Sequence, residues 1–194
     1  MIRSEANAQL KERVRAFWQE HPCGTKFADA PEGSRRFFEL VEQHRYQKEW
    51  HIPVAADFQS SKGLRVLEIG CGLGTDGAQF AEAGADYTGV DLTDAAVELA
   101  RKRFELFGLP GKFRTADAEQ LDFPDETFDV VFSHGVLHHT PDINSAVREI
   151  HRVLRPGGRL LNHGISRPAR PGARTRAGVP ISSASSWCRT TSAR

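Results

Sequence analysis

The first sixty residues carry their apolar side chains at helical spacing. Over residues 5–20 these side chains occupy positions i, i+4, i+7 and i+8 of an amphipathic helix, namely Leu10, Val14, Phe17 and Trp18. Ser34 is a favourable N-cap for a second helix, which runs towards Trp50 and ends before Pro53. The pattern therefore predicts a helical segment over residues 1–60.

From Leu64 onwards, short apolar runs alternate with helical stretches. Strands are predicted at residues 64–69, 86–91 and 128–133, and a further strand begins at Arg159. This alternation predicts an α/β fold over residues 61–162. We expect a Rossmann-like, doubly wound, mostly parallel sheet with helices on both faces.

Two of the helices between these strands have ends that the sequence indicates. Thr93 is expected to cap a helix over residues 94–107, which Gly108 ends because glycine adopts the left-handed conformation readily. Thr140-Pro141 is expected to open a later helix, with proline at its tolerated first position, and that helix ends near Leu154.

The composition is that of a globular protein. Charged residues make up 26% and apolar residues 39% of the 194 positions, which is enough chain for one sizeable core. Residues 1–162 hold all 25 acidic residues but only 20 of the 26 basic ones, so a nucleic-acid partner is not expected. No apolar run approaches the roughly 18 residues of a membrane helix, and no signal peptide is visible. The three cysteines form no CxxC pair, which favours the reducing cytoplasm. We therefore expect a cytoplasmic protein, and from the lack of a long apolar run we expect no membrane span.

The most informative stretch is Val66 to Gly77, where a strand ends in closely spaced glycines and a helix resumes. Glycine at such a corner permits positive φ, and the following helix presents free N–H groups to a ligand. The dinucleotide pattern G-x-G-x-x-G fails from Gly70 but is met from Gly72 by Gly74 and Gly77, so NAD is not excluded. The stretch indicates a cradle for a nucleotide-type cofactor.

Glu68 favours a different cofactor, because it gives the run V-L-E-I-G-C-G-L-G-T. This run resembles motif I of the class I S-adenosylmethionine (SAM) dependent methyltransferases. Further motifs follow in that family's order, the last being Leu154-Arg155-Pro156-Gly157-Gly158, and the resemblance covers roughly residues 64–161. It is similar in particular to small-molecule methyltransferases of quinone biosynthesis. The resemblance implies a SAM-binding domain over residues 61–162, with residues 1–60 as a lid.

The predicted cofactor contacts follow these motifs. Asp91, at the end of the second strand, can accept hydrogen bonds from both ribose hydroxyls. The resemblance places Asp117 at the adenine amine, although Glu119 and Asp122 lie near enough to take that role. The predicted cofactor residues are Glu68, Gly70, Cys71, Gly72, Gly74, Asp91, Leu92, Asp117, Ala118, Ser133 and His134.

His138 and His139 are the candidate catalytic residues, as a general base for an acceptor that must lose a proton. A packed or loop histidine is the alternative interpretation of each. No metal site is expected here, because adjacent residues point in different directions and no carboxylate lies at ligand spacing. Few catalytic residues are needed, since the sulfonium of SAM already makes its methyl group electrophilic.

We therefore predict a SAM-dependent methyltransferase that acts on a small-molecule acceptor. The acceptor is not readable from the shared motifs, because substrate pockets in this family are built from variable segments. Two other functions stay open. One is a SAM-binding fragment without turnover, and the other is an NAD-dependent oxidoreductase, although the Ser-Tyr-Lys type of catalytic set is missing.

The last 32 residues, 163–194, differ in composition from the rest. Arg, Ala, Ser, Pro, Gly and Thr supply 26 of them, and no helical or strand periodicity is visible, so we expect disorder. The family continues here with a full fifth strand, a helix and a hairpin, whereas this chain turns polar at Asn162. A gene read out of frame after about residue 161 would give such a tail, and a natural basic tail is the alternative.

Overall fold

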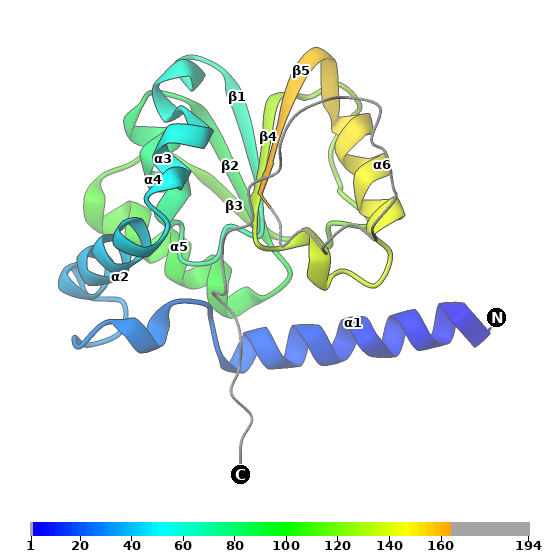
Figure 1. Ribbon diagram of the computed structural model, residues 1–194, viewed down its shortest axis with the longest axis horizontal. Helices are drawn as coiled ribbons and strands as arrows, with labels where there is room; N and C mark the ends of the chain where they lie inside the picture. Colours follow the sequence, from blue (N-terminus) through cyan, green and yellow to red (C-terminus); the bar gives the residue numbers. More distant parts are fainter. Residues whose placement is uncertain (1, 164–194) are drawn as a thin grey trace, which may run out of the picture.

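The central element is a five-stranded sheet in the order β3-β2-β1-β4-β5. The computed structural model describes residues 2–163, and every strand pairing in that range is parallel (Figure 1). The strands are β1 (Arg65–Ile69), β2 (Asp86–Asp91), β3 (Lys112–Thr115), β4 (Phe128–His134) and β5 (Leu154–His163). The chain winds outward from β1 to β3, then returns to place β4 on the other side of β1. This confirms the predicted doubly wound fold.

Helices cover both faces of the sheet, and each face has its own apolar core. The helices after β1 are α4 (Thr75–Glu82), α5 (Asp94–Phe107) and α6 (Ile143–Val153). Val66 of β1 packs with Phe80 and Phe104 of α4 and α5. The next residue, Leu67, packs with Ile150 of α6 on the opposite face. Both faces are apolar because alternate side chains of a strand point to opposite faces, and both are covered.

A helical segment precedes the sheet, as the sequence predicts. Its elements are α1 (Ile2–Glu20), η1 (Thr25–Phe27), α2 (Arg35–Lys48), α3 (His51–Ala56) and η2 (Phe58–Ser61). Helix α1 runs past the end of the sheet where the strands terminate (Figure 1). Phe37, Phe38 and Val41 of α2 form a third apolar cluster with Leu73, which follows β1. The cluster fixes α2 against the glycine corner.

The second predicted helix is confirmed, and a short helix that was not predicted follows it. Ser34 caps α2, because its hydroxyl accepts a hydrogen bond from the Phe37 N–H at 3.1 Å. However, α2 ends at Lys48, and Pro53 lies inside the separate short helix α3. Proline is tolerated there because the N–H groups of a first helical turn have no partner in the helix.

Two later helices are capped differently from the prediction. The bounds of α5 are confirmed, but the Thr93 hydroxyl donates to Asp91 at 2.9 Å and makes no cap hydrogen bond. Helix α6 starts at Ile143, after Thr140-Pro141, because Asp142 caps it. The Asp142 carboxylate accepts hydrogen bonds from the N–H groups of Asn144 and Ser145. A carboxylate is the stronger acceptor at a helix N-terminus.

Strand β5 is longer than the sequence predicts. It begins at Leu154, and its pairing with β4 shifts register between Phe128 and Val130. Its last residue, His163, pairs with His134, so His163 belongs to the sheet and not to the tail. For the rest of the predicted tail, residues 164–194, the predictions of disorder and of a changed reading frame lie outside the described residues.

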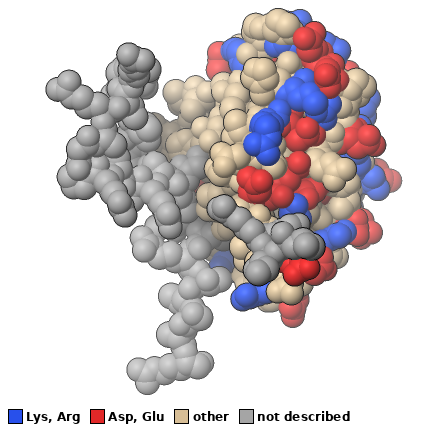
Figure 2. Space-filling model, turned by 90° about the vertical axis from the view of Figure 1, so that its right-hand side faces the viewer, with Lys and Arg blue, Asp and Glu red and all other residues tan. Residues whose placement is uncertain are grey.

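The surface of the domain carries charges of both signs. On the face seen in Figure 2, basic and acidic side chains are interspersed. Among residues 2–163, no helix combines the length and the apolar character that crossing a membrane requires.

Candidate active site

A pocket lies at the carboxyl ends of β1, β2 and β4, and α1 and α2 contribute to its wall. The sheet order reverses between β1 and β4, and open α/β sheets bind ligands at such a switch point. All but two of the predicted site residues line this pocket. Those that do are Glu68, Gly70, Cys71, Gly72, Asp91, Leu92, Asp117, Ala118, His134, His138 and His139.

The first two glycines of the corner have different roles. Both have positive φ, at +77° for Gly70 and +51° for Gly72. A Cβ added to Gly70 would lie 2.2 Å from Cγ2 of Val136. Glycine at this position therefore leaves room for the loop that follows β4. A Cβ added to Gly72 would meet no atom within 4 Å. Gly72 therefore leaves open space at the pocket, where a ligand can approach the backbone.

Gly74 and Gly77 serve packing and do not line the pocket. Gly74 precedes α4 with φ +69°, and its added Cβ would lie 3.3 Å from the Ala100 Cβ. An added Cβ on Gly77 would lie 2.2 Å from the hydroxyl of Tyr87 in β2. In the dinucleotide-like pattern, Gly74 and Gly77 thus reflect the close packing of α4 on its neighbours, and only Gly72 faces the pocket.

Asp91 ends β2 with its carboxylate held by three donors. Oδ2 accepts a hydrogen bond from the Gly72 N–H at 3.1 Å. Oδ1 accepts from both the N–H and the hydroxyl of Thr93, at 3.0 and 2.9 Å. Burial raises the pKa of Asp91, and these hydrogen bonds only partly offset that rise. The contacts fix the orientation of the carboxylate at the pocket wall.

Glu68 is a second buried acid in the pocket wall. Its side chain is buried, and the hydroxyl of Tyr87, on the neighbouring strand β2, donates to its Oε2 at 2.6 Å. Burial, followed by the negative charge of Asp76, raises the pKa of Glu68 well above its ordinary value. A cationic ligand in the pocket would favour the ionised form of Glu68.

Asp76 and Arg45 form a buried ion pair that sequence reasoning missed. Arg45 of α2 donates from Nη2 and Nε to the two Asp76 oxygens, at 2.5 and 3.1 Å. The Tyr46 hydroxyl also donates to Asp76, at 3.0 Å. Burial acts to raise the pKa of Asp76, but Arg45 outweighs it and the pKa is lowered. Asp76 lies in the first turn of α4, where acids are common, but nothing in the helical pattern of α2 indicates its partner.

Tyr46 and Trp50, two aromatic residues near the end of α2, differ in their positions. Tyr46 packs partly against the core while its hydroxyl reaches Asp76. Trp50 is 71% exposed and lies outside the pocket lining. Only Tyr46 therefore supports the site.

Lys11 connects α1 to the predicted adenine end of the pocket. Its ammonium lies 2.5 Å from Asp117 Oδ2 and 2.6 Å from Glu119 Oε2. Burial acts to lower the pKa of Lys11, but the hydrogen bonds to Asp117 and Glu119 outweigh it, and the pKa is raised. The second oxygen of Asp117 accepts a hydrogen bond from the Glu119 N–H at 2.9 Å. Asp117 is thus oriented from two sides.

His138 and His139 lie in the short helix η3 (Leu137–His139) with ring centroids 3.9 Å apart. His138 is exposed, whereas His139 is half-buried and packs edge-on against Trp18 of α1, at 5.5 Å. Burial lowers the pKa of both imidazoles, and His138 lowers that of His139 further. A neutral His139 beside the pocket can accept a proton near pH 7.

Ser133 and His134 differ although they are neighbours in β4. Ser133 is fully buried and donates to the Ile69 carbonyl at 3.1 Å, so it braces β1 and does not line the pocket. His134 lines the pocket, and Arg45 Nη2 lies 3.3 Å from its Nδ1. Burial, followed by the charge of Arg45, lowers the pKa of His134 to about 3. The imidazole is therefore neutral over the physiological range.

Comparison with known proteins identifies the domain. Residues 67–162 match the family described as a methyltransferase domain. Phthiotriol/phenolphthiotriol dimycocerosates methyltransferase of Mycobacterium leprae is 33% identical over 172 residues, which are 82% of this chain and 63% of that protein. Fatty-acid O-methyltransferase of Mycolicibacterium smegmatis is 38% identical over 125 residues, or 63% of this chain and 44% of that protein.

A solved structure agrees with these relatives. The trans-methyltransferase CalH, in complex with SAH, matches with a TM-score of 0.54 and 26% identity, over 67% of this chain and 41% of that one. The chain spans 38% to 63% of the length of the first curated relatives that it matches. These similarities support the methyltransferase prediction over the NAD-dependent alternative. The chain belongs to the class I SAM-dependent methyltransferases.

Proposed function

We propose that this protein binds SAM in the pocket and transfers its methyl group to a small-molecule acceptor. The observation that supports this most is the meeting of three predicted features at one switch point. These are the glycine corner at Gly70 and Gly72, the carboxylate of Asp91, and Asp117. A SAM-binding fragment without turnover is the alternative, and the experiments below separate the two.

The residues that line the pocket fit SAM. Gly72 leaves space for a ligand to approach the backbone, next to Asp91, which would receive the ribose hydroxyls. Asp117 would receive the adenine amine, with Leu92 and Ala118 beside the base. Glu68 would face the cationic methionine end, because a positive ligand stabilises the ionised form of a buried acid.

When bound, SAM supplies a methyl group that its positive sulfur makes electrophilic. The residues of the chain then have two tasks, which are to align the acceptor atom with that methyl group and to exclude water. Helix α1 supports both tasks, because Lys11 and Trp18 hold it against the pocket. His139 accepts the proton when the acceptor atom must lose one.

The pocket lining indicates an acceptor with a large apolar part. Apolar side chains of the N-terminal segment and the loops line it, among them Val14, Trp18, Val41, Leu73 and Leu137. Such a lining binds apolar groups, and a few polar groups fix their orientation. One matched relative is named for a fatty acid, which has the same character. We infer a lipid-like acceptor with a hydroxyl or carboxyl group.

Calorimetric titration of the full chain with SAM, and separately with NAD, tests the cofactor. We expect one SAM per chain and no heat from NAD, whereas binding of NAD without SAM would overturn the proposal. Incubation with methyl-labelled SAM and a mixture of fatty acids and long-chain alcohols then tests turnover. SAM binding without labelled product would favour the non-catalytic fragment.

The role of His139 has its own test. His139→Gln should lower turnover by about 100-fold, within the range for general-base catalysis, and leave the SAM affinity unchanged. His151→Gln is a matched control, because His151 is exposed on α6 and away from the pocket. Equal activity of the two variants would remove His139 from the mechanism.

A further inference from the structure

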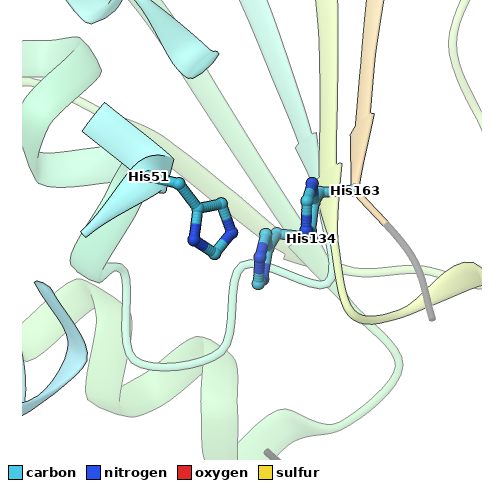
Figure 3. Close-up of side chains that lie close together, drawn as sticks. All are labelled: His51, His134 and His163. Atoms are coloured by element: carbon cyan, nitrogen blue, oxygen red, sulfur yellow. The ribbon is translucent and has the colours of Figure 1, made fainter. Parts of the chain in front are cut away.

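Three histidines from distant parts of the chain meet beside the pocket. His51 begins α3, His134 ends β4, and His163 ends β5 (Figure 3). One ring nitrogen of each lies within 4.8 Å of those of the other two. The rings of His134 and His163 are stacked, with centroids 5.0 Å apart and planes at 3°. The centroids of His51 and His163 are 4.6 Å apart.

The cluster contains buried polar atoms without a hydrogen-bond partner. Nε2 of His51 and Nε2 of His134 are both inaccessible to solvent and make no hydrogen bond of normal geometry within the described residues, although a Glu49 oxygen lies 3.1 Å from that of His134. Buried polar atoms are nearly always paired, because leaving one unpaired costs about 1–3 kcal/mol. Two such nitrogens in one cluster are therefore available as donors to a ligand.

A carboxylate completes the set of donors. Oε2 of Glu49, whose side chain is 1% exposed, lies 3.1 Å from Nε2 of His134. Glu49 precedes His51 by two residues, at the junction between α2 and α3. Three imidazoles and one carboxylate are a donor set that borderline divalent ions such as Zn²⁺ favour. Mg²⁺ and Ca²⁺ instead prefer sites made of oxygen atoms.

The geometry points to a Zn²⁺-type metal site formed by His51, His134, His163 and Glu49. Donor atoms on one tetrahedral zinc ion lie about 3.4 Å apart, so the cluster needs side-chain adjustments of roughly 1 Å to close. Arg45 approaches the other ring nitrogen of His134, and its charge is already compensated by Asp76. The ion would lie in the pocket wall, because His134, His163 and Glu49 also line the pocket.

This site differs from the adjacent pair His138 and His139. Those two side chains share one short helix, whereas the cluster joins three elements that only the fold brings together. The inference goes beyond the proposed methyl transfer, because a metal can bind these side chains whether or not SAM is present. Its test is therefore run without SAM.

Titration of chelator-treated full-length protein with Co²⁺ tests the site, since Co²⁺ reports its coordination by visible absorption. We expect one ion per chain with a tetrahedral spectrum, displacement by Zn²⁺ and no competition by Mg²⁺. His51→Ala and His163→Ala should each weaken binding at least 100-fold. His151→Ala, on the exposed face of α6, should bind as the unaltered protein does.

Circular dichroism of each variant establishes that it is folded, and His163→Asn replaces His163→Ala if the latter is not. Retention of the spectrum in folded His51→Ala protein would overturn the site. An intense sulfur-to-cobalt absorption band would also overturn it, because the ion would then be bound by cysteine. Failure of SAM binding in the separate calorimetric titration would not affect this result.

Discussion

Two halves of the pocket are built in different ways. The half that we propose for the cofactor comprises the ends of β1, β2 and β3 with the loops that follow them, and its positions are set largely by backbone conformation. Gly70 and Gly72 have positive φ, and Asp91 is held largely by N–H groups. The half that we propose for the acceptor comprises α1, α2, the first turn of α4 and the ends of β4 and β5. Its positions are set by side-chain pairs between distant segments, such as Arg45 with Asp76.

The two halves also differ in how far the charges of their buried acids are compensated. In the cofactor half, burial raises the pKa of both Glu68 and Asp91, so these acids lack enough compensation for their charge. In the acceptor half, Asp76 has a lowered pKa because Arg45 compensates it. The cofactor half is therefore prepared for a ligand with positive charge and hydrogen-bond donors, whereas the charges of the acceptor half hold the helices in place.

The largest expected effect is that of Gly70→Ala, which breaks the cofactor half at its backbone. Positive φ costs about 1–2 kcal/mol for a residue with a Cβ, and the overlap with Val136 adds about 1–3 kcal/mol. We expect the free energy of unfolding in urea to fall by about 3 kcal/mol and SAM binding to be lost. Gly72→Ala, which meets no atom within 4 Å, should cost only about 1–2 kcal/mol. Equal losses of stability in the two variants would show that the positive φ alone, and not the overlap with Val136, accounts for the cost.

The same difference between the two halves explains which parts of the structure the sequence predicts. The sheet and the glycine corner are readable because apolar runs and glycines are local signals, and nearly all predicted cofactor residues line the pocket. Ser133 and Gly74 are the exceptions, and the spacing of Gly74 fits a cradle although its contact is with Ala100 of α5. A residue spacing does not show what the residue touches.

The contacts of the acceptor half could not be predicted from the sequence, because they join residues that are far apart in the chain. Arg45 and Asp76 are 31 residues apart, Lys11 and Asp117 are 106 apart, and no local pattern links such pairs. The start of α6 is a further example in which residue type alone did not give the answer. Thr140 and Asp142 are both plausible caps by residue type, and the geometry of the loop selects Asp142.

The second prediction tests the cofactor half through its acid. Asp91→Ala should weaken SAM binding by about 1.5–3 kcal/mol, the range for hydrogen bonds to a charged group. Asp86→Ala is the control, because Asp86 lies at the other end of β2, in an exposed ion pair with Lys112. Calorimetry of both variants makes the comparison. Unchanged SAM affinity in Asp91→Ala would refute the ribose assignment.

The third prediction concerns the uncompensated charge of Glu68. Its folded-state pKa is raised above the ordinary value of 4.5, so the stability it contributes is present below that pH and is lost as the pH rises towards the folded pKa. The free energy of unfolding should fall over this range by up to about 1.4 kcal/mol per pH unit. Glu68→Gln should remove that dependence, because an amide does not titrate.

Urea unfolding between pH 5 and 8 compares the two proteins. Glu68→Gln should exceed the unaltered protein in stability at the alkaline end, and the difference should shrink towards pH 5. Saturating SAM should also reduce the pH dependence of the unaltered protein, because a cationic ligand compensates Glu68. If the free energy of unfolding changes with pH in the same way in both proteins, Glu68 carries no uncompensated charge.

The smallest expected effect on stability comes from Lys11→Met, which removes the connection between the halves. The Lys11 side chain is 28% exposed, and ion pairs at such positions contribute less than about 1 kcal/mol. Methionine keeps the apolar part of the side chain, so the free energy of unfolding should change little. The tether of α1 to Asp117 and Glu119 is lost, however, and local opening of α1 should become easier.

Three measurements on Lys11→Met then decide whether the halves act together. Limited proteolysis should cleave α1 faster, and kcat/KM for the acceptor should fall by about three- to tenfold, because α1 carries part of the acceptor wall. SAM affinity should stay within about twofold, because the contacts of Asp91 and the glycine corner are untouched. Arg13→Met, an exposed substitution on the same helix, is the control. If SAM affinity falls as far as turnover does, the two halves are one cooperative unit and the separation drawn between them is wrong.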